Sequence, residues 1–267
     1  MEIIILPSKE DVYKEASERI ISLVNRLHNA VLGLATGRTM LGVYEVLLDA
    51  YRKGRVDFSS VVTVNLDEYL GLSPEDPLSF HHYMHEHFFN HVNIKKENQL
   101  IPDPLPGDVE KECEDYEKAI NRRGGIDLQL LGVGKDGHIG FNEPSSSLQA
   151  RTRVKTLTDE TLKDNFGSTE GPRFAITMGI GTIMEAKEIV LVAVGEEKAD
   201  AISRAVEGPV TASCPASALQ LHPIAKVIID TAAARLLKRK DYYMWVWEHK
   251  KQVEKPHLLY KKKRDES

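Results

Sequence analysis

Mostly apolar runs of a strand's length alternate along this chain with segments in which apolar residues recur at helical spacing. Val12, Ala16 and Ile20 illustrate the helical spacing. Strands that are apolar on both faces and separated by amphipathic helices are typical of a parallel sheet covered on both sides. The sequence therefore predicts an α/β fold, a Rossmann-like open and mostly parallel sheet with helices on both faces. The predicted strands are Ile3–Leu6, Ala30–Ala35, Val61–Leu66, Ile126–Leu131, Phe174–Met178, Ile189–Val194 and Val227–Ile229.

Ser8, followed three residues later by Asp11, resembles the capping box that starts a helix. Further helices are predicted near 78–91 and over 109–123. Five of the ten histidines lie in the first of these. His81/His85 and His87/His91 have the spacing of zinc ligands on a helix, but the two pairs fall on different faces. Exposed histidines on an amphipathic helix are the favoured interpretation, and no metal is expected.

Three polar segments begin where predicted strands end: Thr36–Thr39, Asp67–Glu68 and Gly132–Glu143. In open parallel sheets, ligands bind beyond the carboxyl ends of the strands. The three segments are therefore expected to share one edge of the sheet. Asp67 directly follows its strand and is placed to act as a general base, whereas Glu68 is expected to cap the next segment.

The segment 132–144 places Asp136, His138 and Glu143 on a backbone with four glycines. Glycine permits tight turns and close approach to a ligand, so the three side chains are expected to converge. The spacing Gly-x-Gly-x-x-Gly formally matches a dinucleotide fingerprint, which requires a helix to begin inside the motif. The continuation Ile139–Pro144 is a poor helix start, and we expect no dinucleotide.

A phosphate site is expected at the strand-to-helix turn formed by Thr36, Gly37, Arg38 and Thr39, where backbone N–H groups and hydroxyls can cradle an anion. This turn is not a Walker loop, because its spacing is one residue short and Arg38 stands where lysine would be. Lys198 lies at another such transition and is interpreted either as a further phosphate ligand or as a solvated lysine.

The net charge of −5 disfavours a nucleic-acid partner. The first residues lack the basic start and long apolar core of a signal peptide, and no apolar run has the length of a membrane span. Cys113 and Cys214 lack metal-binding spacing and are expected to be reduced. A cytoplasmic protein without a membrane partner is expected.

The chain resembles glucosamine-6-phosphate deaminases of the glucosamine/galactosamine-6-phosphate isomerase family, from its first strand to about Asp230. The segments that carry the resemblance are Leu32–Gly37, Val64–Tyr69, Gly134–Pro144 and Ser217–His222. The resemblance implies a phosphorylated amino sugar as substrate, namely glucosamine 6-phosphate, which is converted to fructose 6-phosphate and ammonia without metal or organic cofactor.

Roles for individual residues follow from the same resemblance. The aspartate that matches Asp67 moves a proton between C2 and C1 of the sugar, through an enediol-type intermediate. The histidine that matches His138 assists ring opening, supported by carboxylates that match Asp136 and Glu143. Phosphate ligands of the family map onto Thr36–Thr39 and Lys198.

This chain departs from the family pattern at the phosphate end. Members usually have a second small residue where Arg38 stands, and many carry an arginine in a mobile lid. The lid segment here is shortened and reads Asn165–Ser168. We therefore expect Arg38 to supply the missing cation.

Some members are hexamers activated by N-acetylglucosamine 6-phosphate, and Ser146, Arg153 and Lys155 match their effector ligands. The aromatic segment 242–247 differs from the tail of those members and is interpreted as a packing helix. Allosteric activation and a homo-oligomer both stay open.

Three rival functions remain. A galactosamine-6-phosphate deaminase is hard to distinguish from the glucosamine enzyme, because the two substrates differ only in the configuration of one hydroxyl group. A 6-phosphogluconolactonase would share Gly-x-Asp-Gly-His but lacks the continuation Phe141–Pro144. A sugar-phosphate sensor of transcription regulators normally contains a DNA-binding segment, and no such segment is recognised in this sequence. The predicted organisation is a single sugar-phosphate isomerase/deaminase domain over 1–240, followed by a C-terminal helix and charged tail over 241–267.

Overall fold

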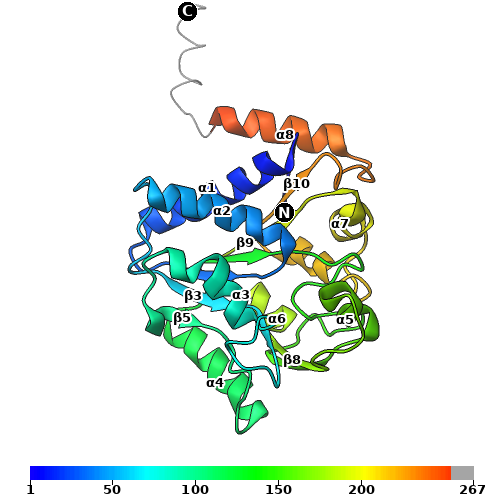
Figure 1. The fold of residues 1–267 in the computed structure, drawn as a ribbon. Helices are drawn as coiled ribbons and strands as arrows, with labels where there is room; N and C mark the ends of the chain where they lie inside the picture. Colours follow the sequence, from blue (N-terminus) through cyan, green and yellow to red (C-terminus); the bar gives the residue numbers. More distant parts are fainter. Residues whose placement is uncertain (254–267) are drawn as a thin grey trace, which may run out of the picture.

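The computed structural model describes residues 1–253, and the predicted charged tail beyond them lies outside the described residues (Figure 1). These residues form a seven-stranded parallel sheet in the order β1-β10-β9-β6-β2-β3-β5. The predicted α/β architecture is thus confirmed. The strands are β1 Glu2–Leu6, β2 Val31–Leu34, β3 Val62–Asn65, β5 Gln99–Leu100, β6 Leu128–Leu131, β9 Glu188–Ala193 and β10 Ala225–Asp230.

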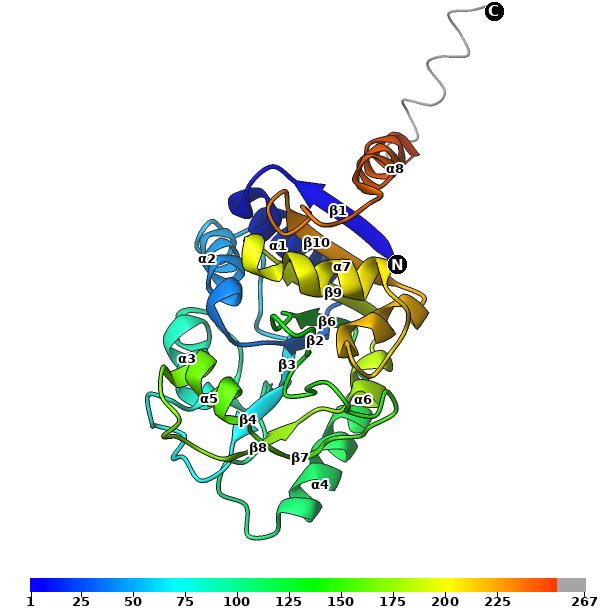
Figure 2. The same ribbon diagram turned by 90° about the vertical axis from the view of Figure 1, so that its right-hand side faces the viewer.

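Helices connect the strands of the sheet. Ser8 caps the first of them as predicted, because its hydroxyl accepts the N–H of Asp11 and donates to the Asp11 carboxylate. In both ribbon views α8 and α4 lie at opposite ends of the molecule, with the sheet between them (Figures 1 and 2). The helices are α1 Lys9–Arg26, α2 Arg38–Arg52, α3 Phe80–His87, α4 Val109–Arg122, α5 Asp159–Phe166, α6 Ile180–Met184, α7 Ala199–Glu207 and α8 Lys240–Val253.

A second, antiparallel sheet was not predicted. It consists of β4 (Asp67–Tyr69), β8 (Phe174–Thr177) and β7 (Arg153–Thr156). The run at 174–178 was predicted as a strand, but it belongs to this small sheet and not to the parallel one. Leu66 joins the two sheets, because its N–H donates to Leu34 and its carbonyl accepts from Met178. An apolar run identifies a strand without identifying its partners, which long-range contacts decide.

The predicted helix over 78–91 is shorter than expected. The α3 helix ends at His87, and Phe88 leaves the helical region before a 3₁₀ turn at Phe89–His91. His81 contacts Glu68, and the His91 ring contacts the carbonyl of Glu86. Within residues 1–253, no group of three or more metal-binding side chains is placed to hold an ion.

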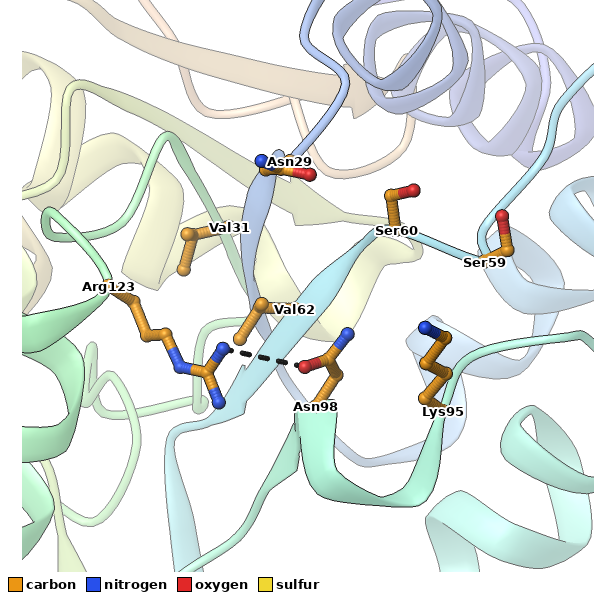
Figure 3. A pocket seen from close by; sticks show the side chains of 8 residues that line it. All are labelled: Asn29, Val31, Ser59, Ser60, Val62, Lys95, Asn98 and Arg123. Atoms are coloured by element: carbon orange, nitrogen blue, oxygen red, sulfur yellow. Dashed lines mark hydrogen bonds between the residues drawn. The ribbon is translucent and has the colours of Figure 1, made fainter.

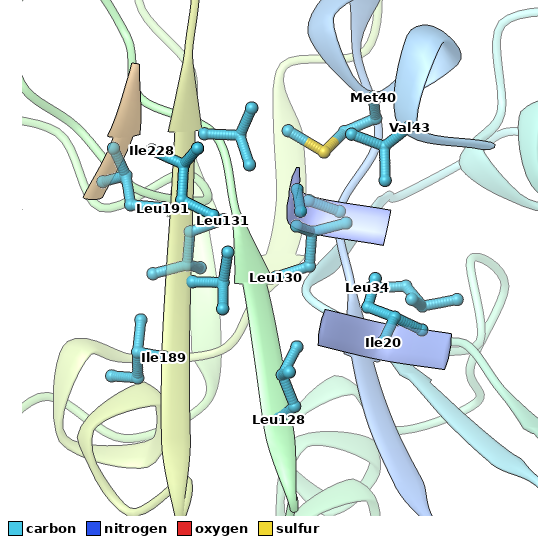
Figure 4. Packing of buried hydrophobic residues seen from close by; sticks show 14 of the residues in the cluster. Ile20, Leu34, Met40, Val43, Leu128, Leu130, Leu131, Ile189, Leu191 and Ile228 are labelled. Carbon is cyan, nitrogen blue, oxygen red and sulfur yellow. The ribbon is translucent and has the colours of Figure 1, made fainter. Parts of the chain in front are cut away.

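The main core fixes the ends of the strands that lead to the candidate site. Leu130 of β6 and Leu34 of β2 are buried together with Met40 and Val43 of α2 (Figure 4). Burial of one such side chain is worth about 1.5–3 kcal/mol. Because Met40 directly follows the predicted phosphate turn, its burial holds the start of α2, and hence that turn, at the end of β2.

Two cavities of the described residues lie away from the predicted site. One, of about 370 Å³, lies at the start of β2 and β3 and is lined by Asn29, Val31, Ser59, Ser60, Val62, Lys95, Asn98 and Arg123 (Figure 3). The other, of about 170 Å³, lies beside α4 and α6 and includes Glu117 and Arg151. Neither contains a residue predicted for the site. Over the same residues, no helix combines the length and apolar character needed to cross a bilayer.

Candidate active site

Four neighbouring strands deliver the predicted segments to one edge of the sheet, as expected. In the order β9-β6-β2-β3, the strands are followed by Lys198, the 132–144 loop, the Thr36–Thr39 turn and Asp67. All four strands are parallel, so their carboxyl ends meet at the same edge. The pairing of the sheet thereby gathers residues that are far apart in the sequence.

Asp67 is a buried carboxylate in an environment that disfavours its charge. It is 6% exposed, and within the described chain its carboxylate has no hydrogen-bond or ion-pair partner. Burial, and then the charge of Glu68, raise the pKa of Asp67 to about 8. A carboxylate with a pKa near neutrality is well suited to take and return a proton.

Glu68 is fully buried and anchors the start of α3, as its predicted capping role requires. Its carboxylate accepts the backbone N–H groups of Phe80 (2.9 Å) and His81 (2.7 Å). Adjacent residues of a strand point to opposite faces. Glu68 therefore anchors the backbone while Asp67 points toward the 132–144 loop.

The 132–144 loop holds the His138 ring in a defined orientation. His138 Nδ1 lies 2.7 Å from Asp136 Oδ1, and the same oxygen accepts the backbone N–H of His138 at 3.1 Å. Burial opposes ionisation of Asp136, but the hydrogen bonds from His138 outweigh it and lower the Asp136 pKa. Because an ionised carboxylate only accepts, Nδ1 carries the proton, and Nε2 is the ring atom that can exchange one.

Two glycines of the loop have positions that a side chain would disturb. A Cβ at Gly134 would lie 2.1 Å from the His138 ring, so the ring packs directly over this glycine. Gly140 has a φ of +55°, and a Cβ there would lie 3.4 Å from Asp67 Oδ2. The loop therefore brings its backbone against the predicted base. No helix begins within the loop, in keeping with the rejection of a dinucleotide site.

Asn142 and Glu143 attach the loop to the small sheet and to α5. Asn142 donates to the carbonyls of Ile139 (2.9 Å) and Met178 (2.8 Å). Glu143 accepts a hydrogen bond from the Thr161 hydroxyl of α5. The carboxylate that contacts His138 is therefore that of Asp136, while Glu143 connects the loop to the lid segment.

The lid segment packs on the residue next to Glu68. Phe166 lies 5.1 Å from Tyr69, centroid to centroid, and Asn165 donates to the Tyr69 hydroxyl at 2.9 Å. Tyr69 also packs on Phe141 of the loop at 5.4 Å. A small aromatic core thus links α5, β4 and the loop, and it places the shortened lid beside the predicted base.

The phosphate turn presents an unbalanced positive charge. Gly37 precedes α2 with a φ of +102°, and Arg38 is its first residue. The Arg38 side chain is exposed and, among the described residues, contacts no carboxylate. The first turn of α2 contains no acidic residue. A cation at the positive end of a helix is unfavourable without an anion nearby.

The three residues matched to an effector site are not equivalent. Ser146 is buried and its hydroxyl has no partner within the described chain. Arg153 donates to the Asn142 side chain at 2.9 Å, so it contacts the base of the 132–144 loop. Lys155 follows two residues later on the same face of β7, and both side chains are half-buried.

Three residues that support the site were missed. Arg204 of α7 donates to the carbonyl of Asp136 at 3.2 Å, Thr177 accepts the N–H of Phe141 at 3.1 Å, and Thr161 contacts Glu143. Thr177 lies in a predicted strand, so its position at a strand end was a usable signal. Arg204 is 68 residues from Asp136, and no sequence pattern indicated their contact.

The chain is similar to known proteins in sequence and in structure. The model of the family "Glucosamine-6-phosphate isomerases/6-phosphogluconolactonase" matches residues 7–228. The glucosamine-6-phosphate deaminase of Thermoanaerobacter pseudethanolicus is 50% identical over 245 residues, which cover 90% of this chain and 97% of that protein. That of Cellvibrio japonicus is 52% identical over 247 residues, covering 91% of this chain and 94% of the relative.

Solved structures give a consistent result. A monomeric glucosamine-6-phosphate deaminase superposes with a TM-score of 0.86 at 41% identity, covering 88% of this chain and all of that one. A 6-phosphogluconolactonase from Trypanosoma cruzi has a TM-score of 0.71 at 18% identity, covering 89% of this chain and 97% of its own. At that identity the second likeness concerns the fold alone.

Proposed function

This chain belongs to the glucosamine-6-phosphate isomerase/6-phosphogluconolactonase family, and we propose that within it the chain is a glucosamine-6-phosphate deaminase. The observation that carries the proposal is the edge of the sheet where Asp67 meets a loop bearing the Asp136–His138 pair. Identity of about half to deaminases over nine-tenths of the chain supports the same substrate.

The proposed reaction uses the two ends of this site in turn. His138 Nε2 exchanges a proton with the ring oxygen and opens the sugar, with Asp136 holding the imidazole. Asp67 then removes the proton from C2 and returns it to C1, through an enediol-type intermediate, so that the C2–nitrogen bond becomes an imine. Water hydrolyses the imine to fructose 6-phosphate and ammonia. The opposite pKa shifts of Asp67 and Asp136 suit a base and an ionised support.

The remaining site residues are assigned to binding and support. The Thr36–Thr39 turn follows β2 and Lys198 follows β9, at the same edge of the sheet on either side of β6, and both are proposed to hold the phosphate. Glu143 is proposed to act through its contact with Thr161, by holding α5 beside the loop. A role for Ser146, Arg153 and Lys155 in effector binding remains a proposal that rests on their match to the family.

The direct test is ammonia release from glucosamine 6-phosphate and galactosamine 6-phosphate, measured side by side. We expect kcat/KM for the glucosamine ester to exceed that for its epimer by about tenfold, because leaving a buried partner of a sugar hydroxyl unpaired costs about 1–3 kcal/mol. Higher activity with galactosamine 6-phosphate would show that this epimer is the preferred substrate. No ammonia from either substrate, together with hydrolysis of a phosphogluconolactone, would replace the proposal with the rival enzyme.

Arg38→Ala is expected to raise KM for glucosamine 6-phosphate about tenfold and to change kcat little, because the arginine binds the phosphate equally before and during the reaction. The matched control is Arg52→Ala at the other end of α2, which is exposed and should leave both constants unchanged. An unchanged KM in Arg38→Ala would show that the phosphate is held by other groups.

A further inference from the structure

Glu68 is more enclosed than its capping role requires. Its side chain is 0% exposed, and its two oxygens accept the N–H groups of Tyr69 (2.7 Å), Phe80 and His81. Oε2 also lies 2.7 Å from His81 Nδ1. Burial of a carboxylate beside a second buried carboxylate is costly unless its hydrogen bonds are complete.

Capping alone does not explain this arrangement, because α3 already has an N-cap. Ser79 precedes the helix, and its hydroxyl accepts the N–H of His82 at 3.0 Å. The contact that a cap does not need is the one between Glu68 and the His81 ring. That ring is 21% exposed, so it links a carboxylate that is closed to solvent with the surface of the protein.

We propose that Glu68 and His81 form a positioning pair for Asp67, in which Glu68 fixes β4 against α3 and the hydrogen bond from His81 Nδ1 limits how much negative charge Glu68 presents to the base. This inference rests on the proposed role of Asp67 as carbon base. The Nδ1 hydrogen bond draws the Glu68 charge toward His81 and away from Asp67. The pair thereby adjusts the charge directly behind the reacting carboxylate.

Few other ionisable groups among the described residues lie near Asp67, Glu68 and His81. On β4 itself, Tyr69 also experiences the charges of Asp67 and Glu68, and from the turn before α3, Glu75 faces His81. The strand β8 places Thr177, Ile176 and Ala175 opposite β4, and none of these is ionisable. From α4, Tyr116 faces Asp67. Burial is the main cause of the raised Asp67 pKa, and Glu68 is the second.

The test is the pH profile of kcat/KM for ammonia release in four variants. Glu68→Gln removes the charge beside Asp67 and should move the lower midpoint of the profile down by about one pH unit. His81→Ala removes the hydrogen bond that spreads the Glu68 charge and should move the midpoint up. His81→Asn keeps a donor near the position of Nδ1 and should restore the wild-type midpoint. His85→Asn, on the same helix and away from Glu68, is the matched control.

Opposite shifts in Glu68→Gln and His81→Ala, with rescue by His81→Asn, would support the pair. A uniform loss of rate with unmoved midpoints would mean that the pair only braces the fold, and it would overturn the inference. If Glu68→Gln fails to fold, the comparison of His81→Ala with His81→Asn decides alone. A wild-type protein that releases no ammonia would contradict the proposed function, whereas an active one with unmoved midpoints contradicts the pair.

Discussion

Replacing Asp67 with asparagine is expected to lower kcat for ammonia release by about 10³-fold while leaving KM within a few-fold of the wild-type value. The amide keeps the shape of the carboxyl group but cannot accept the C2 proton. Asp49→Asn, which changes an exposed aspartate paired with Lys53 on α2, is the control and should retain full activity. Undiminished activity in Asp67→Asn would assign the proton transfer to another group.

The same substitution is expected to stabilise the protein at high pH. The pKa of Asp67 is raised from 3.8 to about 8 by burial and then by Glu68. The unfolded chain loses this proton near pH 4 and the folded chain near pH 8, so the wild-type protein loses stability as pH rises between these values. The uncharged amide of the Asp67→Asn variant has no such penalty. Unfolding by urea at pH 5 and pH 9 should show an advantage for the variant that grows to a few kcal/mol at pH 9.

Activity of the wild-type protein should follow the opposite trend. The base must be ionised to remove a proton, so kcat/KM is expected to rise with pH toward a midpoint near 8. Ionisation of Asp67 thus destabilises the fold and activates the enzyme over the same pH range. A profile already flat below pH 6 would contradict the environment described for Asp67.

The parts of this molecule that could be predicted are those set by local pattern. Apolar runs identified six of the seven strands of the main sheet and missed β5, which is only two residues long. Polar residues after the predicted strands 30–35, 61–66 and 126–131 indicated the edge that carries the candidate site. The small sheet could not be found in this way, because β4 is only three residues long and its sequence, Asp-Glu-Tyr, is polar. The strand β4 forms through pairing with β8, which lies more than a hundred residues away in the sequence.

The contacts that orient the site were equally beyond local pattern. The pairing of Asp136 with His138 is local, and the sequence suggested it. The contact of Arg204 with Asp136, and that of Phe166 with Tyr69, depend on how α7 and α5 pack on the finished fold. Sequence reasoning therefore proposed which residues would carry the chemistry, whereas the structure was needed to identify which residues hold them.

Gly134→Ala is expected to lower kcat/KM by about 10²-fold or more with little loss of stability. The added Cβ would lie 2.1 to 2.5 Å from three atoms of the His138 ring, a separation that real contacts do not reach. The ring must leave its position beside Asp136, and since it is 32% exposed it can turn toward solvent without disturbing the core. The imidazole then no longer meets the sugar ring oxygen in a fixed orientation, and general acid–base catalysis contributes about 10²–10⁴-fold.

Gly132→Ala is the matched control for this prediction. A Cβ there meets only Met40 Cε at 3.5 Å, an ordinary contact, so activity and melting temperature should stay near the wild-type values. The double variant Gly134→Ala/His138→Ala tests the cause. If the methyl group acts by displacing the ring, the double variant should be no slower than His138→Ala alone, because the same interaction cannot be lost twice. Additive losses would instead mean that Gly134 contacts the substrate through its own backbone.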